Sequence, residues 1–390
     1  MLSEQVLGNV LKTYRRILEN NLTTFIIFMS NLHAFLKMAF EVFYLNKKRH
    51  DAFVKELLDR GFVIDEYTGK RMSAGTSIAA ITNLWFSSLR GFPSNAQEKR
   101  CGLLVGAITP IYDDLLDVHG FTSLAEKSFD QILAEESMYH GMKNNLNDLF
   151  LWLMKQANDS IMLKDEYRMF FQQTIVSQKE SLRQMEGIEL NQKELERIMM
   201  MKGGNATLLY RHLLGNKMKE GEEQLVFATG GLMQFANDIF DTWSDHKSGN
   251  RTLATISTNP SDLKKTYFKL LREVVKRAVE LPYPQNNILA FLRFLLPVIA
   301  RTLVCFDQFE RLFTTYGHFD IPSFSRQQMI CDMEKPVNMF ANVRYAAKLF
   351  DEEVKPLIKK IEHLVFLRQT IDQCSDYISF LLPLPMKCFQ

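Results

Sequence analysis

Cysteine is scarce in this chain of 390 residues, which contains only five. The five are dispersed and odd in number, and no Cys-x-x-Cys pair occurs, so the pattern counts against a disulfide scaffold and indicates free thiols in a reducing compartment. They are Cys101, Cys305, Cys331, Cys374 and Cys388. The first five residues include an acid and no basic stretch that leads into an apolar run, so we expect no secretory signal and a cytoplasmic protein.

A surplus of charge of one sign is also absent. Lys and Arg number 47, Asp and Glu number 45, and the formal net charge is +2 at pH 7. This balance counts against nucleic acid as a partner, because proteins that bind it favour a basic stripe. The sequence has no Gly-x-Gly-x-x-Gly and no P-loop pattern, so nucleotide binding has no support. The eight histidines show no zinc-ligand spacing, and neither acidic cluster has the Glu-x-x-His pairs of a di-iron bundle.

A long apolar run without polar residues is missing from the N-terminal region. The most apolar stretch there, residues 22–45, contains Asn31, His33, Lys37 and Glu41. Such residues are typical of an amphipathic or buried helix rather than of a membrane span, so we expect no stable membrane span.

Helical periodicity and apolar residues are abundant. The chain is 46% hydrophobic, contains 30 Phe and 19 Met, and shows no strand-like alternation. Length alone allows two or three domains, but the continuous helical pattern predicts one all-α domain over residues 1–390, with peripheral helices at 1–60 and 338–390. Phe and Met suit a helical core, and an aromatic cavity that stabilises carbocations would use the same residues. Composition does not separate these two uses.

The first acidic cluster lies in the largely apolar segment 106–120 and consists of Asp113, Asp114 and Asp117. On a helix Asp113 and Asp117 share one face, where like charges repel. A bound divalent cation removes this repulsion, and Mg²⁺ prefers oxygen ligands from one or two carboxylates and substrate phosphates. Pro110 lies one turn before Asp113, and we expect it to kink the helix there.

A second cluster, Asn237, Asp241 and Asp245, has i, i+4, i+8 spacing, so one helical face presents three oxygen ligands. It begins 124 residues after the first cluster (237 − 113). Two solvated acidic helix faces are the plain alternative. The apolar residues around both clusters argue against it, because they indicate helices packed in a core. We expect the second helix to span residues 222–245, with Gly230 and Gly231 permitting close packing.

Asp-Asp-x-x-Asp followed by Asn-Asp-x-x-Asp-x-x-x-Asp resembles the paired metal motifs of class I isoprenoid synthases, which include terpene cyclases and squalene/phytoene-type coupling enzymes. As a cyclase motif, the second cluster has Asp241 where Ser or Thr is usual and Asp245 where Glu is usual. As a coupling-enzyme motif, it continues through Gly249 and Arg251. The resemblance implies a helical bundle around a deep apolar cavity, with both motifs at its mouth. It also implies three Mg²⁺ ions and an allylic isoprenyl diphosphate as substrate, and it allows a homodimer.

The same resemblance implies cations that hold the diphosphate. Two glycines follow Lys202, and we expect them to interrupt the helix, either as a plain loop or as the helix break that these synthases place beside the diphosphate. Lys247 and Arg251 lie in a basic loop directly after the second motif. The full set of candidate substrate-binding residues is Lys202, Arg211, Lys247, Arg251, Arg344, Tyr345 and Arg183.

Arg344-Tyr345 enters that set because it resembles an Arg-Tyr pair near the C-terminus of many terpene cyclases. Arg183 enters it as the nearest upstream arginine, since Asn191 occupies the position where bacterial cyclases have one. The adjacent Asp113 and Asp114 favour a cyclase, whereas the second motif also fits a coupling enzyme. We expect a cyclase, with head-to-head prenyl coupling and a non-catalytic helical scaffold as the alternatives.

Overall fold

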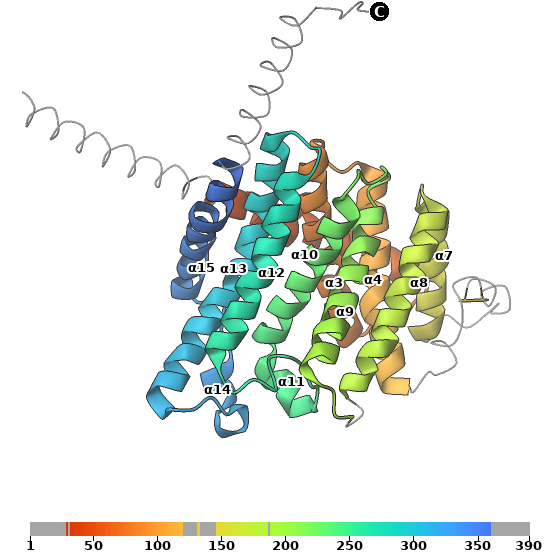
Figure 1. The fold of residues 1–390 in the computed structure, drawn as a ribbon. Helices are drawn as coiled ribbons and strands as arrows, with labels where there is room; N and C mark the ends of the chain where they lie inside the picture. Colours follow the sequence, from red (N-terminus) through yellow and green to blue (C-terminus); the bar gives the residue numbers. More distant parts are fainter. Residues whose placement is uncertain (1–28, 30–31, 120–130, 133–145, 186–187, 360–390) are drawn as a thin grey trace, which may run out of the picture.

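The fold is that of a computed structural model, which describes residues 29, 32–119, 131–132, 146–185 and 188–359 (Figure 1). The described part contains α- and short 3-10 and π-helices and no strand, so the predicted all-α class is confirmed. The outermost parts of the predicted peripheral helices, residues 1–28 and 360–390, lie outside the described residues. The single-domain organisation of the whole chain stays a prediction.

In chain order, the first helices are η1 (Phe40–Asn46), α2 (Lys47–Asp59), α3 (Glu66–Arg90), α4 (Ala96–His119), α7 (Leu146–Ser160), α8 (Lys164–Ser181), α9 (Gln192–His212), α10 (Glu222–Phe240) and α11 (Thr242–Ser248). They continue with α12 (Pro260–Glu280), α13 (Gln285–Tyr316), α14 (Arg326–Met329), α15 (Pro336–Leu349) and η5 (Phe350–Val354). Short 3-10 turns follow α8 (η3, Leu182–Gln184) and α13 (η4, Ile321–Ser323). Figure 1 shows the helices side by side in one bundle, with α15 at its edge.

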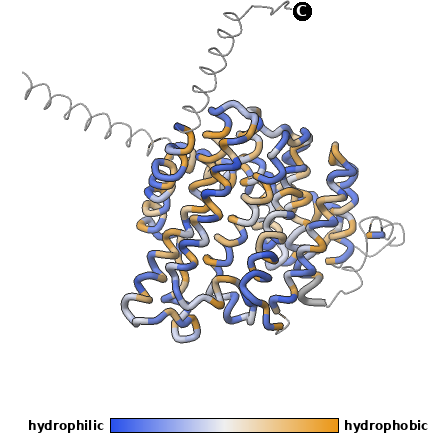
Figure 2. The backbone as a smooth tube through the Cα atoms, in the orientation of Figure 1, coloured by the Kyte–Doolittle hydropathy of each residue, from blue (hydrophilic) through white to orange (hydrophobic). Residues whose placement is uncertain are grey.

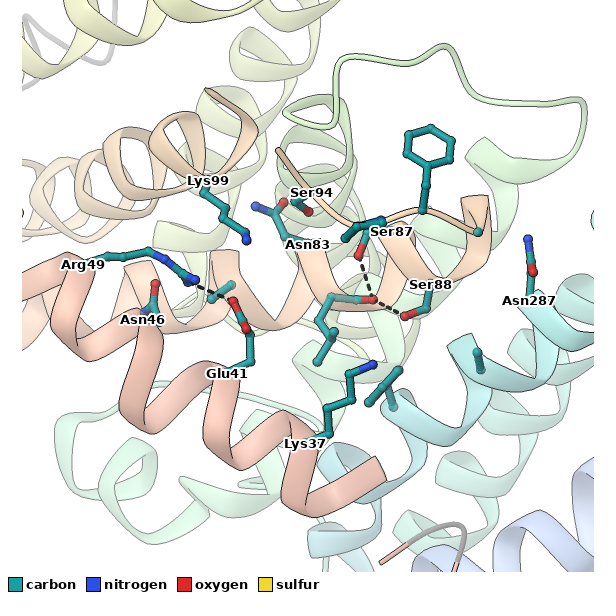
Figure 3. Close-up of a pocket in the computed structure, with 18 of the residues that line it drawn as sticks. Lys37, Glu41, Asn46, Arg49, Asn83, Ser87, Ser88, Ser94, Lys99 and Asn287 are labelled. Carbon is teal, nitrogen blue, oxygen red and sulfur yellow. Dashed lines mark hydrogen bonds and ion pairs between the residues drawn. The ribbon is translucent and has the colours of Figure 1, made fainter. Parts of the chain in front are cut away.

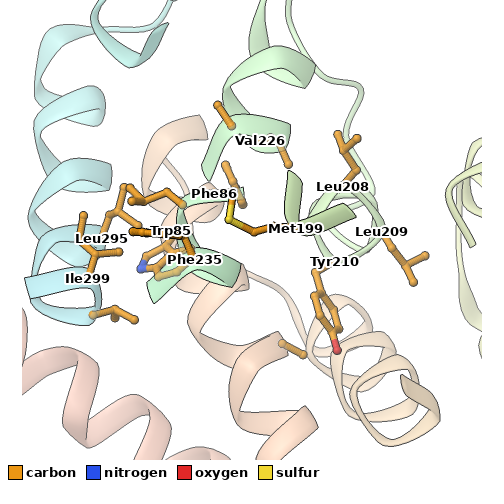
Figure 4. Close-up of a cluster of buried hydrophobic side chains, with 14 of the residues drawn as sticks. Trp85, Phe86, Met199, Leu208, Leu209, Tyr210, Val226, Phe235, Leu295 and Ile299 are labelled. Atoms are coloured by element: carbon orange, nitrogen blue, oxygen red, sulfur yellow. The ribbon is translucent and has the colours of Figure 1, made fainter. Parts of the chain in front are cut away.

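One apolar core holds the bundle together. It extends from Ala34 to Val354 and includes a cluster where α3, α10 and α13 meet (Figure 4). Trp85 is almost fully buried there, and its indole N–H donates to the carbonyl oxygen of Phe294 at 3.0 Å. That bond satisfies the only polar atom of a large core side chain. Hydrophobic residues alternate with hydrophilic ones along the helices in Figure 2, as the helical periodicity requires.

Helix α13 is the one described helix long and apolar enough to cross a membrane. In the bundle, 78% of its most apolar window is buried against other helices. Because a core helix of a water-exposed bundle has this property, the finding agrees with the expected absence of a stable membrane span.

Helix α9 runs unbroken through Gly203 and Gly204, so the predicted interruption after Lys202 is wrong. Its first turn is fixed by a capping box in which Asn191 accepts the backbone N–H of Glu194 and the Glu194 side chain accepts that of Asn191. The glycines have a packing role instead. A Cβ at Gly203 would overlap the carbonyl oxygen of Gly230 in α10, and a Cβ at Gly230 would overlap that of Gly203. Two glycines therefore bring the two backbones into direct contact, and the close packing predicted at Gly230 is confirmed.

Helices α3 and α4 make the same kind of contact. A Cβ added at Gly75 would overlap the carbonyl oxygen of Gly106, and one added at Gly106 would lie 2.7 Å from Thr76 Cα. Pro110 lies one turn further along α4, inside the helix. The hairpins α3–α4 and α9–α10 are therefore both held by a glycine-to-glycine contact.

The two hairpins form an internal repeat. The second helix of each begins with a buried glutamate, Glu98 or Glu222, and its contact glycine, Gly106 or Gly230, follows eight residues later. The acidic motif starts seven residues after that glycine in both helices. Equivalent positions are 124 residues apart (222 − 98, 230 − 106 and 237 − 113). The two acidic clusters therefore occupy equivalent places in two similarly built helix pairs.

Candidate metal and diphosphate site

The acidic clusters lie toward one end of the bundle. At the opposite end, the Arg90 guanidinium binds Glu98 near the start of α4 at 2.6 Å and donates to Asn216 Oδ1, in the loop between α9 and α10, at 2.9 Å. Helices α4 and α10 thus start close together. Each then runs 15 residues from its glutamate to the first residue of its motif, a rise of about 22 Å. In Figure 1 α10 descends to α11 at the lower end of the bundle.

Asp113 lies at the surface of the bundle between α3, α4 and α8. Its side chain is 32% exposed and accepts a hydrogen bond from Gln178 Nε2 of α8. Arg71 Nη2 of α3 lies 3.8 Å from Asp113 Oδ2. Asp117 follows one turn later within α4, but its side chain lies outside the described residues. The structure therefore shows the Asp113 carboxylate with its partners, and for Asp117 it shows only the backbone position.

Asp114 is directed toward α3. Its side chain is 8% exposed, and Arg71 reaches it with Nη2 at 3.0 Å and Nε at 3.1 Å, while the Tyr67 hydroxyl donates at 3.3 Å. These contacts hold Asp114 in a structural ion pair with Arg71, so Asp114 is less available than Asp113 as a metal ligand. Sequence reasoning missed Arg71, because a partner 43 residues away leaves no local pattern.

The helix predicted over residues 222–245 ends at Phe240, so that bound is wrong, and the second motif continues from α10 into the separate helix α11. Asn237 is exposed in the last turn of α10, and its Nδ2 donates to Asp241 Oδ2 at 2.9 Å. Asp241 sits at the junction of the two helices, and Asp245 follows in the first turn of α11. Within the described chain, neither Asp241 nor Asp245 forms an ion pair with a cationic side chain. Neither carboxylate therefore has an ion-pair partner among the described residues, a place that a bound cation would take.

Burial shapes the electrostatics of this cluster. The pKa of Asp245 is raised to about 6, mainly by burial and also by the charge of Asp241, while a hydrogen bond with Asn250 acts in the opposite direction. Burial likewise raises the pKa of Asp241. Asp238, which the motif analysis left out, is buried, accepts from Gln234 Nε2 at 2.8 Å, and has a pKa raised by burial to about 7. The negative charges of Asp245 and Asp241 also raise the pKa of Asp238, because they oppose its ionisation.

Two cations reach this cluster from other helices. The charge of Lys202 in α9 lowers the pKa values of Asp238 and Asp245. Arg301 of α13 acts in the same way on Asp241, and its guanidinium lies 4.9 Å from the centre of the Phe240 ring. Burial lowers the pKa of Arg301. The sequence offered one indication of Arg301 that was not used, because an arginine inside a strongly apolar helix is rare unless its charge has a partner.

The basic loop after α11 lies close to the end of α8. The backbone N–H of Arg251 donates to the carbonyl oxygen of Gln184 at 3.1 Å, and Gln184 Nε2 donates to that of Arg251 at 2.7 Å. Arg251 Nε is buried and has no hydrogen-bond partner among the described residues. Lys247 is exposed, with Nζ 5.7 Å from the centre of the Trp243 ring. The buried N–H of Arg251 Nε, which has no acceptor among the described residues, suits an anionic ligand. Lys247 lies at the surface, and nothing in its surroundings distinguishes it from other exposed lysines.

Arg211 does not lie with the acidic clusters, contrary to the expected role on the diphosphate. It is fully buried at the C-terminal end of α9, where its Nε donates to Glu222 Oε1 at 2.5 Å. Tyr283 donates its hydroxyl to the other oxygen of Glu222. This group lies at the start of α10, about 22 Å along the helix from Asn237. Arg211 therefore belongs to a buried structural ion pair.

The remaining candidates also have partners of their own. Arg183 pairs with Glu180 at 2.6 Å and with Glu194 at 3.4 Å. Arg344 is exposed on α15, 5.6 Å from the centre of the Tyr345 ring. The Tyr345 hydroxyl donates to Asp307 at 2.5 Å, and burial together with that carboxylate raises its pKa to about 12. No described contact joins these three residues to the acidic clusters.

The chemistry of the ligand atoms fits Mg²⁺ better than zinc, because all are carboxylate or amide oxygens. Among the described residues, no three His, Cys, Asp or Glu side chains converge closely enough to hold a metal by themselves. A metal at either motif would therefore also need oxygen ligands from outside the described side chains, such as phosphate groups or water.

Fold and site together define an all-α bundle with two repeated helix pairs, each ending in an oxygen-rich motif. No protein-family model and no curated protein matches the chain.

Proposed function

We propose that the protein is a Mg²⁺-dependent class I terpene cyclase. It ionises an allylic isoprenyl diphosphate and cyclises the resulting carbocation with release of diphosphate. The observation that carries the proposal is the repeat: two equivalent helices bring oxygen-rich motifs toward one end of the bundle, and no cationic side chain of the described residues lies within ion-pair distance of Asp241 or Asp245. A solvated acidic helix needs neither the repeat nor half-buried carboxylates.

The proposal assigns metal binding to Asp113, Asp117, Asn237, Asp241 and Asp245. When bound, Mg²⁺ neutralises the diphosphate and acts as a Lewis acid that promotes loss of the leaving group. The Asn237 amide orients Asp241 through their hydrogen bond, so that an Asp241 oxygen stays beside Asn237 at the end of α10. Gln178 does the same for Asp113 from α8.

Diphosphate recognition in this proposal uses Lys202 and Arg251. The charge of Lys202 acts on Asp245 of the second motif, and Arg251 has the orphaned buried Nε–H that an anion would satisfy. Both donate hydrogen bonds to the departing diphosphate and stabilise the charge that develops on it. The proposal also requires a cavity lined by apolar side chains, which would exclude water from the cation.

A head-to-head coupling enzyme is the second candidate, and one observation favours it. Gly249 has a φ of +77°, and the loop that it opens holds Arg251 through paired hydrogen bonds with Gln184. Glycine is needed at such a φ, so the Gly-x-Arg continuation of the coupling-enzyme motif has a structural basis here. Such an enzyme joins two allylic substrates and doubles the carbon number of the product.

Ligand-induced stabilisation distinguishes either enzyme from a non-catalytic scaffold. We expect Mg²⁺ and a non-ionisable thio-analogue of an isoprenyl diphosphate to raise the melting temperature together, and neither to do so alone. Asp241→Ala should lose this stabilisation. Asp159→Ala, at an exposed position of α7, is the matched control and should keep it. Equal stabilisation of both variants, or none of the wild type, would favour the scaffold.

A further inference from the structure

A cavity lies far from the acidic clusters. It has a volume of about 490 Å³ and is bounded by the segment Lys37–Arg49, the C-terminal half of α3, the start of α4 and the start of α13 (Figure 3). Lys99 of α4 lines it and precedes Asp113 by 14 residues, a rise of about 21 Å. Because of this separation, a ligand in the cavity would be distinct from the proposed diphosphate. The volume of the cavity is in the range of small-molecule pockets.

One buried side chain at this cavity lacks a partner. Asn83 of α3 is 6% exposed, and its Oδ1 has no hydrogen-bond partner among the described residues. Figure 3 shows its amide between Lys99 and Ser94 at the cavity. A buried amide oxygen without a hydrogen bond has lost its contact with water and gained nothing in return. A ligand that donates a hydrogen bond to Asn83 makes up for that loss.

Two further acceptors lie on the same helix. The hydroxyls of Ser87 and Ser88 both donate to the carbonyl oxygen of Leu84, at 3.2 and 2.7 Å. Because their hydrogens are used, their oxygen atoms remain available to accept from a ligand. Together with Asn83, they form a row of acceptors along α3 that suits hydroxyl groups.

The charged side chains at the cavity have a net positive charge. Arg49 is paired with Glu41 at 2.9 Å, which leaves that pair neutral. Lys37 and Lys99 form no ion pair within the described residues, and Lys37 Nζ lies 5.5 Å from the centre of the Phe294 ring. Two lysines without carboxylate partners among the described residues match an anionic phosphate group.

We infer that this cavity binds a phosphorylated polyol. The phosphate pairs with Lys37 and Lys99, and two hydroxyl groups donate to Asn83 and to Ser87 or Ser88. Such a group exists both as a free metabolite and as the headgroup of a phospholipid, and exposed Phe92 lines the same cavity. Glycerol phosphate is the smallest molecule with this chemistry, and phosphatidylglycerol presents it on a membrane.

Calorimetric titration of the full chain with glycerol 3-phosphate tests this inference, with glycerol and inorganic phosphate as comparisons. We expect glycerol 3-phosphate to bind more tightly than either, because it alone has both groups. Lys99→Met and Lys37→Met should each weaken it about tenfold, since a hydrogen bond to a charged group typically contributes that much. Lys276→Met, an exposed lysine on α12, should leave the affinity unchanged.

Asn83→Ser should remove the preference for glycerol 3-phosphate over inorganic phosphate, while the lysine variants keep the inference testable if this buried change impairs folding. Vesicles containing phosphatidylglycerol identify the source: binding that requires Lys37 and Lys99 indicates a lipid headgroup, and binding of the free ester alone indicates a metabolite. No binding of glycerol 3-phosphate or of the vesicles, or equal affinities for Lys99→Met and Lys276→Met, would overturn the inference.

Discussion

Replacing Gly106 with alanine tests the helix contact on which the geometry of the first motif depends. The new Cβ would lie 2.7 Å from Thr76 Cα, 2.8 Å from the carbonyl oxygen of Gly75 and 2.9 Å from Thr76 N. Comfortable contact between carbon atoms is about 3.5–4.0 Å, so the methyl group is roughly 1 Å too close to three backbone atoms. None of these atoms can rotate away, and α3 and α4 must separate.

The magnitude follows from two opposing effects. Alanine is favoured over glycine within a helix by about 1 kcal/mol, and overpacking typically costs about 1–3 kcal/mol. Because the neighbours of Gly106 are backbone atoms, we expect the upper end of that range and a net loss of about 2 kcal/mol. Gly69→Ala in α3 is the control, since its Cβ meets only Ile64 Cγ2 at 3.8 Å and gains the helix propensity without a clash.

Thermal unfolding followed by circular dichroism measures both variants. Gly106→Ala should lower the melting temperature, and Gly69→Ala should keep or raise it. Gly230→Ala, the equivalent change in the second hairpin, should behave like Gly106→Ala, because its Cβ would overlap the backbone of Gly203. If Gly106→Ala matched Gly69→Ala in sign, the glycine contact would not be what sets the distance between these helices.

Three further outcomes are expected. Arg211→Met leaves the charge of Glu222 buried without its cation, so it should destabilise the fold by about 3–5 kcal/mol in chemical denaturation, whereas an unchanged midpoint would contradict the buried pair. Burial opposes ionisation of Glu98, but hydrogen bonds from Arg90 and Asn95 lower its pKa below the ordinary 4.5. The stability that ionised Glu98 contributes is therefore present above pH 4.5 and is lost as the pH falls through the pKa of the folded state. The difference in melting temperature between wild type and Glu98→Gln should shrink from pH 7 to pH 3, and a constant difference would refute this role of Glu98. Asp113→Ala should abolish diphosphate release and leave the melting temperature nearly unchanged, and substantial turnover by a folded variant would remove Asp113 from the site.

The sequence was most informative where periodicity and local spacing decide the structure. The all-α class follows from helical periodicity, and Asn237 and Asp241 meet on one face because i, i+4 spacing places them there. It failed at Gly203, where a glycine pair was interpreted as a helix break. Helix propensity is local, whereas the reason for these glycines is a backbone contact with α10.

Partners distant in sequence were beyond prediction for the same reason. Arg211 and Arg71 are both cations near apolar helical segments, and nothing local shows that one pairs with Glu222 and the other with Asp114. The internal repeat escaped notice too, because the two hairpins share the positions of a few residues and little overall sequence. Only the structure reveals that Glu98 begins a helix built like that of α10.

The most direct test of the central claim is product analysis. Purified protein is incubated with C10, C15, C20 and C25 allylic diphosphates, with and without Mg²⁺, and extracts are examined by mass spectrometry alongside Asp241→Ala. We predict Mg²⁺-dependent release of one diphosphate per product, and a product with the same carbon number as its substrate, usually cyclic. A C30 or C40 product alone would replace the cyclase with the coupling enzyme. No Mg²⁺-dependent product from any substrate, or the same product from Asp241→Ala, would contradict the account.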